Sequence, residues 1–477
     1  MAHPAEPLIA VLALAAAAGC GDNLPPDPFL GLVRVSGGSP YSTGCGGPQS
    51  GTNYPGIEVE PSVAVDPTDP AHLVGAWQQD RWANGGSNGI GIAASFDGGT
   101  TWTLGVPHFG RCSGGNADNG GDYERATDPW VTFAADGTPF VIGMMFDGTS
   151  PRNAMAAIRS GDGGLSWSEP TVLRADDDPN VLNDKESITA DPKDPGRVYA
   201  VWDRVTGLLR PNEPVGTGPT WFARTSEGAW EPARPIYDPG IDAQTVGNVI
   251  AVLPDGTLVC VFAQITKVSS QTPSTTLGVI RSTDKGMTWS AATLVAPMEG
   301  PGVRDPNNNE PVRSGGGLPA IAVDRKTGAI YVAWEGSRAG MVVDGAMMVR
   351  SLDGGVTWSE PAQINGVPDV SAFTPMVAVT DDGAVGVTYY DLRAADLGDP
   401  SMFRAAAWLA ISRDQGATWS DEPLGAAFDL RPASLTTSYF LGDYEGLTAV
   451  GNTLLAFFVG ATVDSDDKTD VFVYASR

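Results

Sequence analysis

The stretch Ser95-Phe-Asp-Gly-Gly-Thr-Thr-Trp102 recurs along the chain and decides the fold. Its pattern, S-x-D-x-G-x-x-W, is matched in full by four further stretches, Ser160–Trp167, Ser282–Trp289, Ser351–Trp358 and Ser412–Trp419. A shortened copy lies at Thr225–Trp230, and the copies follow one another every 57 to 69 residues. The chain is therefore an array of repeats.

Each residue type in the motif suits a tight hairpin. A Ser and an Asp two residues apart can hydrogen-bond the turn backbone, the Gly permits positive φ, and the Trp packs over the turn. One carboxylate per turn is too few oxygen ligands for calcium. We therefore predict a structural role, with no metal, for Asp97, Trp102, Asp162, Trp167, Asp284, Trp289, Asp353, Trp358, Asp414 and Trp419.

Apolar runs separated by turns precede each copy of the motif. In the first repeat, the runs 62–66 and 72–77 flank a turn at Asp66–Pro70. Each repeat thus reads as four antiparallel strands, which is the unit of a β-propeller. We predict an all-β propeller of seven blades, with six as the alternative, as a single domain over residues 29–477.

The last repeat lacks its fourth strand. It begins at Gly446 and the chain stops at Arg477, before a final hairpin. The apolar run 30–36 can supply the missing strand, and this would remove an open sheet edge. We therefore predict that an N-terminal strand closes the ring.

Composition excludes several classes of function. The chain has 477 residues, of which 60 are Gly and 38 are Pro, and its hydrophobic content of 42% is that of a folded protein. Its formal net charge of −27 repels phosphate backbones and anionic membranes. We expect no nucleic-acid partner and a monomeric protein.

The first residues have the features of an export signal. An apolar run at 8–18 is too short to span a bilayer, and Ala17-Ala18-Gly19-Cys20 resembles a bacterial lipobox. We predict a signal peptide at 1–20, lipidation of Cys20, a tether at 21–28 and a cell-envelope location, with the lipid as the only contact with a membrane. Plain secretion and an ordinary buried apolar start remain the alternatives.

The other three cysteines differ in their surroundings. Cys45 and Cys112 lie in Gly-rich loops, and in an exported protein such a pair is expected to form a disulfide. Cys260 lies in an apolar run that reads as a buried strand, so we expect it to be free. The alternative is three free thiols.

The repeated motif is similar to the Asp-box, or BNR repeat, of sialidases and their relatives, and the resemblance covers essentially the whole chain after residue 28. It implies that the Asp-boxes are structural and that a ligand site is formed by the connections at the opposite face. Those connections carry charge in recurring places, including Asp128, Asn183–Glu186 and Asp443–Glu445. They should line one mouth around the axis, unless they only bridge neighbouring blades.

The sialidase resemblance also implies individual site residues. Sialidases hold the substrate carboxylate with three arginines and use a Tyr nucleophile with acidic partners. Arg81, Arg393, Arg404 and Tyr444 match the family motifs, whereas Val59 stands where the first arginine should be. The expected Asp and Glu are also missing. We name Asp80 and Glu445 as candidate replacements, and Asp391, Trp82 and Tyr123 as further ligand-binding residues.

The resemblance implies a sialidase-like propeller that binds extracellular glycans, with weak or no sialidase activity. The incomplete arginine set and the acidic surface weigh against the hydrolysis of anionic sialosides. An active exo-sialidase-type glycoside hydrolase of altered specificity is the first alternative, and a non-catalytic envelope scaffold or protein-binding propeller is the second. We expect no cofactor, but the acidic loops 116–122 and 464–470 leave calcium as an alternative.

Overall fold

The computed structural model of the protein describes residues 27–207, 216–226, 228–270, 272–338, 340–396, 401–433, 438–462 and 467–476. The predicted signal peptide, Cys20 and most of the tether lie outside the described residues. Within them, every element is a β-strand apart from two 3-10 helices, η1 (Arg111–Ser113) and η2 (Arg431–Ala433). The prediction of an all-β fold is thus confirmed. The described residues contain no helix with the length and apolar character needed to cross a membrane.

Antiparallel groups of strands follow one another along the chain, and within each group the first strand is the innermost. The first group is β2 (Glu58–Asp66), β3 (Asp69–Arg81), β4 (Ser87–Ser95) and β5 (Thr103–Gly105). The second is β6 (Arg125–Phe133), β7 (Pro139–Phe146), β8 (Arg152–Arg159) and β9 (Thr171–Asp177). The third is β10 (Val181–Ala190), β11 (Val198–Thr206) and β13 (Thr220–Ser226), with β14 (Ala229–Trp230) and β15 (Arg234–Tyr237) both paired to β13.

The later groups repeat this order. The fourth is β16 (Ala243–Val252), β17 (Leu258–Thr266), β18 (Ser274–Ser282) and β19 (Thr293–Pro297), with β12 (Thr217–Gly218) parallel to β16. The fifth is β21 (Ala320–Val323), β22 (Ile330–Gly336), β23 (Gly345–Ser351) and β24 (Ala362–Gln363). The sixth is β25 (Ala372–Val379), β26 (Val385–Asp391), β27 (Arg404–Ser412) and β28 (Ser420–Pro423), with β29 (Phe428–Asp429) paired to β27.

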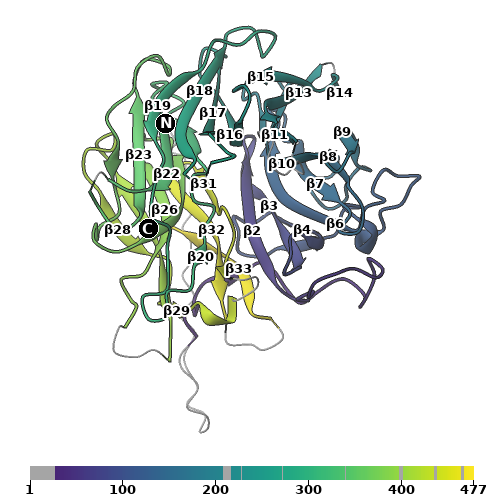
Figure 1. Cartoon of the computed structure of the whole chain (residues 1–477), viewed down its shortest axis with the longest axis horizontal. Coiled ribbons are helices and arrows are strands. Elements are labelled where there is room, and N and C mark those ends of the chain that lie inside the picture. Colours follow the sequence, from purple (N-terminus) through teal and green to yellow (C-terminus); the bar gives the residue numbers. More distant parts are fainter. Residues whose placement is uncertain are drawn as a thin grey trace, which may run out of the picture.

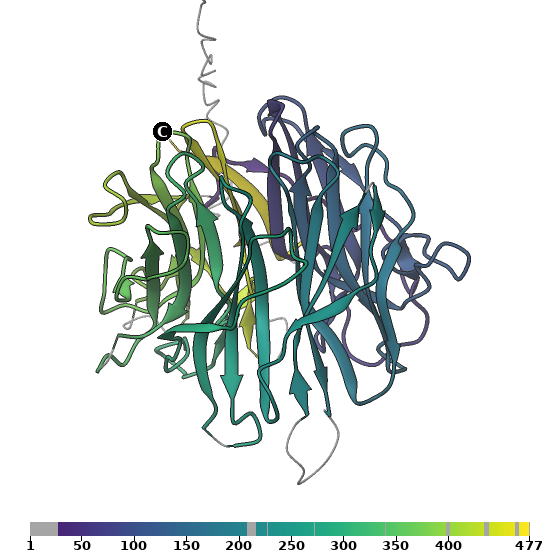
Figure 2. The same cartoon turned by 90° about the horizontal axis from the view of Figure 1, so that it is seen from above.

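The last group joins the two ends of the described chain. It consists of β31 (Gly446–Val450), β32 (Thr453–Ala461), β33 (Thr469–Ala475) and β1 (Val33–Arg34), and β1 pairs antiparallel with β33 through Val33↔Val473 and Arg34↔Phe472. Figures 1 and 2 show the N-terminal strands beside the C-terminal ones. The innermost strands touch in the order β2, β6, β10, β16, β21, β25, β31 and again β2.

The core lies between neighbouring groups, and the second strand of each group is its most buried part. Trp77 on β3, Trp202 on β11 and Trp334 on β22 occupy equivalent places and are almost completely buried. Figure 1 shows the groups arranged around a centre. The innermost strands line a central channel of about 340 Å³. Each of these seven strands contributes residues to its wall. The space between two neighbouring groups is filled by side chains from the sheet faces that are turned towards each other.

The Asp-box hairpins have the internal hydrogen bonds that the motif predicts. In the first copy the Gly99 amide donates to Ser95 Oγ (2.9 Å), and the Thr101 hydroxyl donates to Asp97 Oδ2 (2.6 Å). The same two hydrogen bonds recur in the copies that begin at Ser160, Ser282, Ser351 and Ser412. The hydroxyl residue before the Trp is Thr or Ser in every full copy, a regularity that the eight-residue pattern left open.

The structure links Cys45 to Cys112 by a disulfide and leaves Cys260 free and buried on β17. This is the pairing that the sequence led us to expect. Burial raises the pKa of the Cys260 thiol well above its ordinary range, so the thiol stays protonated at neutral pH. Cys260 is therefore an unreactive core residue.

The Asp-boxes should make the fold sensitive to acid. Hydrogen bonds from the Ser or Thr four residues later lower the pKa of Asp162, Asp284 and Asp353 to about 2. A depressed carboxyl pKa stabilises the fold above the unfolded value of about 4, and this contribution is lost as the pH falls towards 2. Urea midpoints should therefore drop steeply between pH 4 and 2. Thr357→Val removes a hydrogen bond to Asp353, so its urea midpoint at pH 7 should be lower than that of the wild type. The difference between the two midpoints should be smaller near pH 2.

The matched control is Asp118→Asn, in an exposed loop outside the Asp-boxes. It should leave the midpoint unchanged at every pH. An equal loss of stability at pH 7 and pH 2 for Thr357→Val would contradict the proposed role of the Asp353 carboxylate.

Candidate functional site

Five innermost strands contain a β-bulge near their first residues. The strand register shifts at Val59/Ser62, Thr127/Trp130, Asp184/Ser187, Val246/Val249 and Phe373/Met376. At each bulge one residue has positive φ, namely Glu60 (56°), Asp128 (52°), Lys185 (49°), Gly247 (64°) and Thr374 (52°). Left-handed backbone at a bulky residue costs about 1–3 kcal/mol and often marks a functional site. Three of these five residues are charged.

Proline explains why three of the bulges form where they do. Glu60, Asp128 and Thr374 are each followed by Pro. A Pro cannot donate to a neighbouring strand, so inside a sheet it is tolerated at bulges, where a hydrogen bond is already missing. A Pro within an otherwise apolar strand was therefore a signal in the sequence that could have located this site.

The charged bulge residues meet at the axis. Lys185 Nζ lies 2.5 Å from Asp128 Oδ1, 2.8 Å from Asp443 Oδ2 and 3.5 Å from Glu60 Oε1. Asp443 belongs to the loop between β30 (Tyr439–Phe440) and β31. The three carboxylates are buried, and the side chain of Lys185 is 12% exposed. We call Glu60, Asp128, Lys185 and Asp443, together with Arg313, the mouth cluster.

Arginines cover one side of the mouth cluster. Arg313 on β20 (Val312–Arg313), which pairs in parallel with β30, donates from Nε to Asp443 Oδ1 (2.9 Å) and also forms an ion pair with its Oδ2. Arg313 and Arg81 both lie over the ring of Phe440, at 4.6 and 4.8 Å from its centroid. Arg81 is buried, donates to Gln78 Oε1 (2.7 Å) and has no partner for Nε among the described residues. Gln78 in turn donates to Glu60.

Burial and charge set opposite pKa shifts within the cluster. Burial, reinforced by the charge of Asp128 and opposed by Lys185, raises the pKa of Glu60 to about 8. Burial disfavours the charged form of Asp443 too, but Lys185 and Arg313 lower its pKa well below the ordinary range. Although burial opposes charge on Lys185, the surrounding carboxylates raise its pKa well above the usual value. At neutral pH the cluster therefore holds a protonated Glu60 beside an ionised Asp443.

A small pocket lies next to the cluster. Its volume is about 30 Å³, room for roughly two water molecules. Its walls include Trp130, Tyr444 and Leu318, with Lys185 and Asp443 at one side. The rings of Trp130 and Tyr444 lie 5.3 Å apart between centroids. The pocket thus combines aromatic surface with charged groups.

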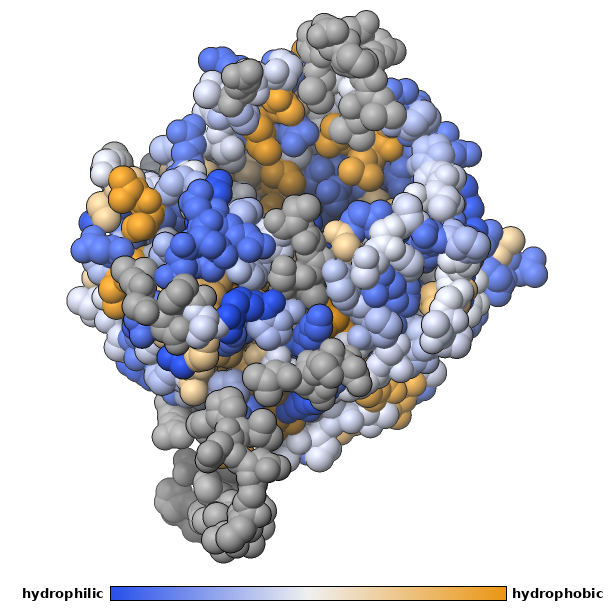
Figure 3. Space-filling model, turned by 60° about the horizontal axis from the view of Figure 1, so that its bottom comes forward, coloured by the Kyte–Doolittle hydropathy of each residue, from blue (hydrophilic) through white to orange (hydrophobic). Residues whose placement is uncertain are grey.

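Hydrophobic and hydrophilic residues also lie side by side on the surface of the molecule. Figure 3 shows a face on which hydrophilic residues predominate, with hydrophobic residues gathered in a hollow near the top of the view.

Tyr444 lies at the mouth, but its hydroxyl is not activated. It donates to the carbonyl oxygen of Pro129 (3.2 Å), and Lys185 Nζ lies 5.8 Å from the centroid of its ring. Burial, reinforced by the charges of Asp128 and Glu60, raises the pKa of Tyr444 well above its ordinary value. The phenolate needed for nucleophilic attack is therefore disfavoured.

The two acidic residues expected to assist Tyr444 have other partners. Glu445 accepts hydrogen bonds from the Tyr390 hydroxyl (2.7 Å) and the Val459 amide (3.0 Å). Asp80 accepts from the Ser39 hydroxyl (2.6 Å) and the Gly56 amide (3.0 Å). Both carboxylates hydrogen-bond groups other than the Tyr444 hydroxyl, and the roles assigned to them from the sequence stay a prediction.

Among the three predicted arginines, Arg81 is linked to the mouth cluster through Gln78 and through the Phe440 ring that it shares with Arg313. Arg393 Nη2 lies 2.9 Å from Asp421 on the outer strand β28, its Nε pairs with Asp391, and its guanidinium lies 3.7 Å from the centroid of Trp408. The Arg393–Asp391 pair is thus part of the sixth group and is directed away from the axis. Arg404 begins β27 and is exposed. Arg81 and Arg393 therefore have separate partners, and a common grip on a carboxylate stays a prediction.

The predicted aromatic residues also lie away from the mouth cluster. Trp82 donates from Nε1 to Asn88 (2.8 Å) and lies beneath Arg125, 4.5 Å from guanidinium carbon to ring centroid. Tyr123 is covered in the same way by Arg152 at 4.6 Å. These rings are occupied by arginines and do not form part of the pocket.

A metal ion has no place within the mouth cluster, because the ammonium of Lys185 occupies the position between the three carboxylates. The residues that sequence reasoning missed include Glu60, Arg313 and Trp130. Glu60 lies in a stretch that matches a sialidase motif without its arginine, and Arg313 lies in a connection without a recognisable pattern.

Comparisons with known proteins give distant matches. No protein-family model matches the chain. A curated xyloglucanase from Paenibacillus sp. is 29% identical over 295 residues, which is 59% of this chain. The matched region spans about a quarter (24%) of the length of that relative.

Similar solved structures include glycan-cleaving enzymes. An α-L-arabinanase of Penicillium chrysogenum complexed with arabinobiose is 14% identical and covers 94% of this chain and 98% of its own, with a TM-score of 0.48. A Hadza microbial sialidase is 17% identical and covers 84% and 76%, with a TM-score of 0.46. A leech intramolecular trans-sialidase is 12% identical and covers 88% and 68%, with a TM-score of 0.43. The chain is thus similar to sialidases and to arabinan-cleaving enzymes.

The mouth cluster should be essential for stability. Lys185→Met would leave the buried carboxylates of Asp128 and Asp443 without their common partner, and such a change typically costs about 3–5 kcal/mol. We expect a loss of that size in urea unfolding at pH 7. The loss should shrink as the pH falls below about 4, because the stability that the depressed pKa of Asp443 contributes is present above its unfolded pKa and is lost as the pH falls towards its folded pKa.

Lys285→Met is the matched control. Lys285 forms an ion pair of 2.6 Å with Asp194, but its side chain is 46% exposed, so its removal should cost no more than about 1 kcal/mol. Similar losses for the two variants would show that the mouth cluster has no special role in stability.

Proposed function

We propose that the protein binds glycans at the propeller mouth and releases little or no sialic acid. The observation that carries this proposal is the aromatic pocket of Trp130 and Tyr444 beside a buried cluster of charges. Aromatic rings stack on the apolar faces of sugars, and nearby carboxylates and cations hydrogen-bond their hydroxyls. The similarity to a xyloglucanase agrees with a glycan ligand.

The size of the pocket defines how a sugar would bind. A volume of about 30 Å³ holds water but not a sugar ring. We infer that a sugar lies across the opening, where it displaces water and contacts the rim of the pocket. Such an arrangement suits one unit of a longer chain better than a fully enclosed terminal sugar.

Weak sialidase activity follows from the arrangement of the arginines and Tyr444. Arg393 is held by Asp391 and Asp421, so it is not available to grip a carboxylate at the axis. A charge-assisted contact of this kind contributes about 1.5–3 kcal/mol. The raised pKa of Tyr444 further disfavours a tyrosine nucleophile.

A glycoside hydrolase that acts on neutral glycans is the second candidate. It is favoured by the opposite pKa shifts of Glu60, raised to about 8, and Asp443, which is lowered. Two carboxyl groups whose pKa values are pushed apart are the usual acid and base of glycoside hydrolysis. In this case Glu60 would protonate the leaving oxygen and Asp443 would be the anionic partner.

We also propose that the ring has seven blades and that β1 completes the last of them. The pairing of β1 with β33 and the circular order of contacts among the innermost strands support this arrangement. In this arrangement β1 covers part of the outer edge of β33.

Export and lipid anchoring through Cys20 complete the proposal. The disulfide between Cys45 and Cys112 supports export, because disulfides form and persist in oxidising compartments. A tether of a few residues would then hold the propeller close to the membrane that carries the lipid.

Glycan binding can be tested with an array that includes xyloglucan, arabinan and sialoside probes. We expect binding to at least one neutral polysaccharide and little release of sialic acid. Trp130→Ala should weaken binding about tenfold through the loss of stacking, whereas Trp408→Ala, under Arg393 in the sixth group, should not. Reducing-end release that disappears in Glu60→Gln would favour the hydrolase.

Two outcomes would contradict the proposal that the protein binds glycans at this mouth and does not turn over sialosides. One is robust release of sialic acid that is lost in Tyr444→Phe, which would make Tyr444 a nucleophile. The other is binding that Trp130→Ala leaves unchanged, which would move the site elsewhere.

Lipid anchoring can be tested by expression in a bacterial host fed with labelled palmitate. We expect the wild-type protein to carry the label and to stay in the membrane fraction after a carbonate wash. Cys20→Ser should be unlabelled and released. An unlabelled wild-type protein in the soluble fraction would instead favour plain secretion.

A further inference from the structure

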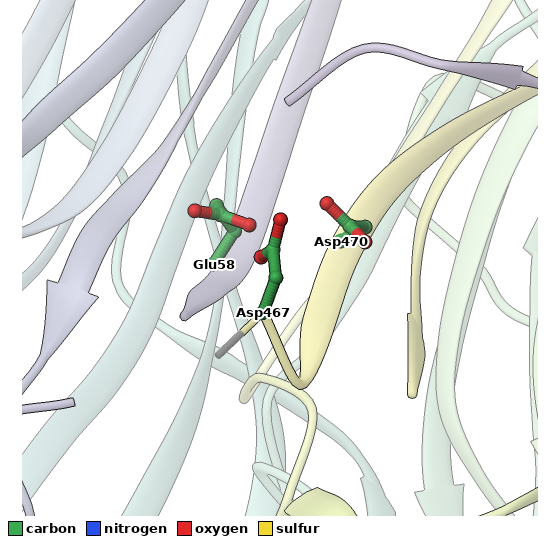
Figure 4. Close-up of side chains that lie close together, drawn as sticks. All are labelled: Glu58, Asp467 and Asp470. Atoms are coloured by element: carbon green, nitrogen blue, oxygen red, sulfur yellow. The ribbon is translucent and has the colours of Figure 1, made fainter. Parts of the chain in front are cut away.

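Three carboxylates from distant parts of the chain meet outside the mouth cluster. Glu58 lies on β2, Asp470 on β33 and Asp467 just before β33, and one oxygen from each lies within 4.8 Å of the others. Glu58 and Asp470 are completely buried, and the side chain of Asp467 is 13% exposed. Figure 4 shows their carboxylates gathered between the first and last groups of strands.

Two of these carboxylates have an oxygen without a partner. Glu58 Oε2 and Asp470 Oδ2 accept no hydrogen bond within the described part of the chain, although both residues have 0% exposure. A buried, unsatisfied carboxylate oxygen is costly and rare in folded proteins. The other oxygen of each is held by a protein group: Gln79 donates to Glu58 Oε1, and the Ser36 hydroxyl donates to Asp470 Oδ1 (3.0 Å).

The positive charge in contact with the three carboxylates is smaller than their negative charge. Arg34 on β1 forms ion pairs with Asp467 and, at 2.6 Å from Nε, with Asp470 Oδ1. Its side chain is 42% exposed and approaches from the outside. Burial, reinforced by the charge of Asp467, raises the pKa of Asp470 to about 7 and that of Glu58 well above its ordinary value. The surroundings therefore favour an additional cation or bound protons.

We propose that Glu58, Asp467 and Asp470 bind a calcium ion. Carboxylate oxygens are the preferred ligands of calcium, at about 2.3–2.6 Å, so ligands on opposite sides of the ion lie about 4.6–5.2 Å apart. The three oxygens lie within 4.8 Å of one another, close enough for one ion to contact all of them. Magnesium usually keeps several water molecules and is bound by one or two carboxylates, so a set of three carboxylates favours calcium. Water molecules would complete the coordination shell.

The position of the site gives the ion a structural role. Glu58 belongs to the first group of strands, whereas Asp467 and Asp470 belong to the last group, and Arg34 belongs to β1, which pairs with β33. A bound calcium ion would cross-link the two ends of the ring. Its binding energy would then add to the stability of the closed fold.

The test uses the full chain after treatment with EDTA and desalting. Calorimetric titration with CaCl₂ should show binding at one site, and calcium should raise the thermal unfolding midpoint, whereas MgCl₂ should bind more weakly. Glu58→Gln and Asp470→Asn should each weaken calcium binding at least tenfold. Asp118→Asn, in the exposed loop, should bind calcium as the wild type does.

A second variant distinguishes a calcium site from a general loss of structure. Arg34→Ala removes the competing positive charge, so it should tighten calcium binding even though it removes two ion pairs. Absence of calcium binding by the wild type at millimolar concentration would overturn the proposal. Unchanged affinity in Glu58→Gln and Asp470→Asn would overturn it equally, because the ion would then bind elsewhere.

Discussion

One ammonium group, that of Lys185, holds together carboxylates from three other parts of the chain. Asp128 comes from the second group of strands, Glu60 from the first and Asp443 from the loop before the last group. Without the ammonium, the buried Asp128 and Asp443 would lose their common partner, which is strongly destabilising. Glu60, Asp128 and Lys185 lie at bulges with left-handed backbone, so the ion pairs offset the strain of the residues that form them.

The parts of the fold that could be predicted from the sequence are those whose interactions are local. An Asp-box completes its hydrogen bonds within eight residues, so the pattern of Ser95, Asp97 and Gly99 already contains the physical reason for the hairpin. Alternation of apolar runs and turns then indicates four strands per repeat. The pairing of Cys45 with Cys112 was predictable for a different reason, since only these two of the three cysteines after residue 28 lie in Gly-rich connections.

The candidate site was predictable only in part, because its chemistry depends on where each side chain points as much as on where its residue lies in the chain. Tyr444 and Arg81 do lie at the mouth, as the sialidase motifs imply, but Tyr444 donates to a backbone carbonyl. Arg393 satisfies its motif and yet points outward, since Asp391 and Asp421 provide nearer partners. A motif of a few letters records which residue stands on a strand and does not record which neighbour it pairs with.

The pairing of β1 with β33 joins residues about as far apart in the sequence as the described chain allows. During synthesis β33, which pairs with β1, is therefore the last of the described strands to leave the ribosome. Until then the growing chain is an open arc with an exposed edge at each end, a form that invites aggregation. Because this contact joins such distant residues, we expect the closure step to be slow, and we expect resistance to proteases to be complete only after it.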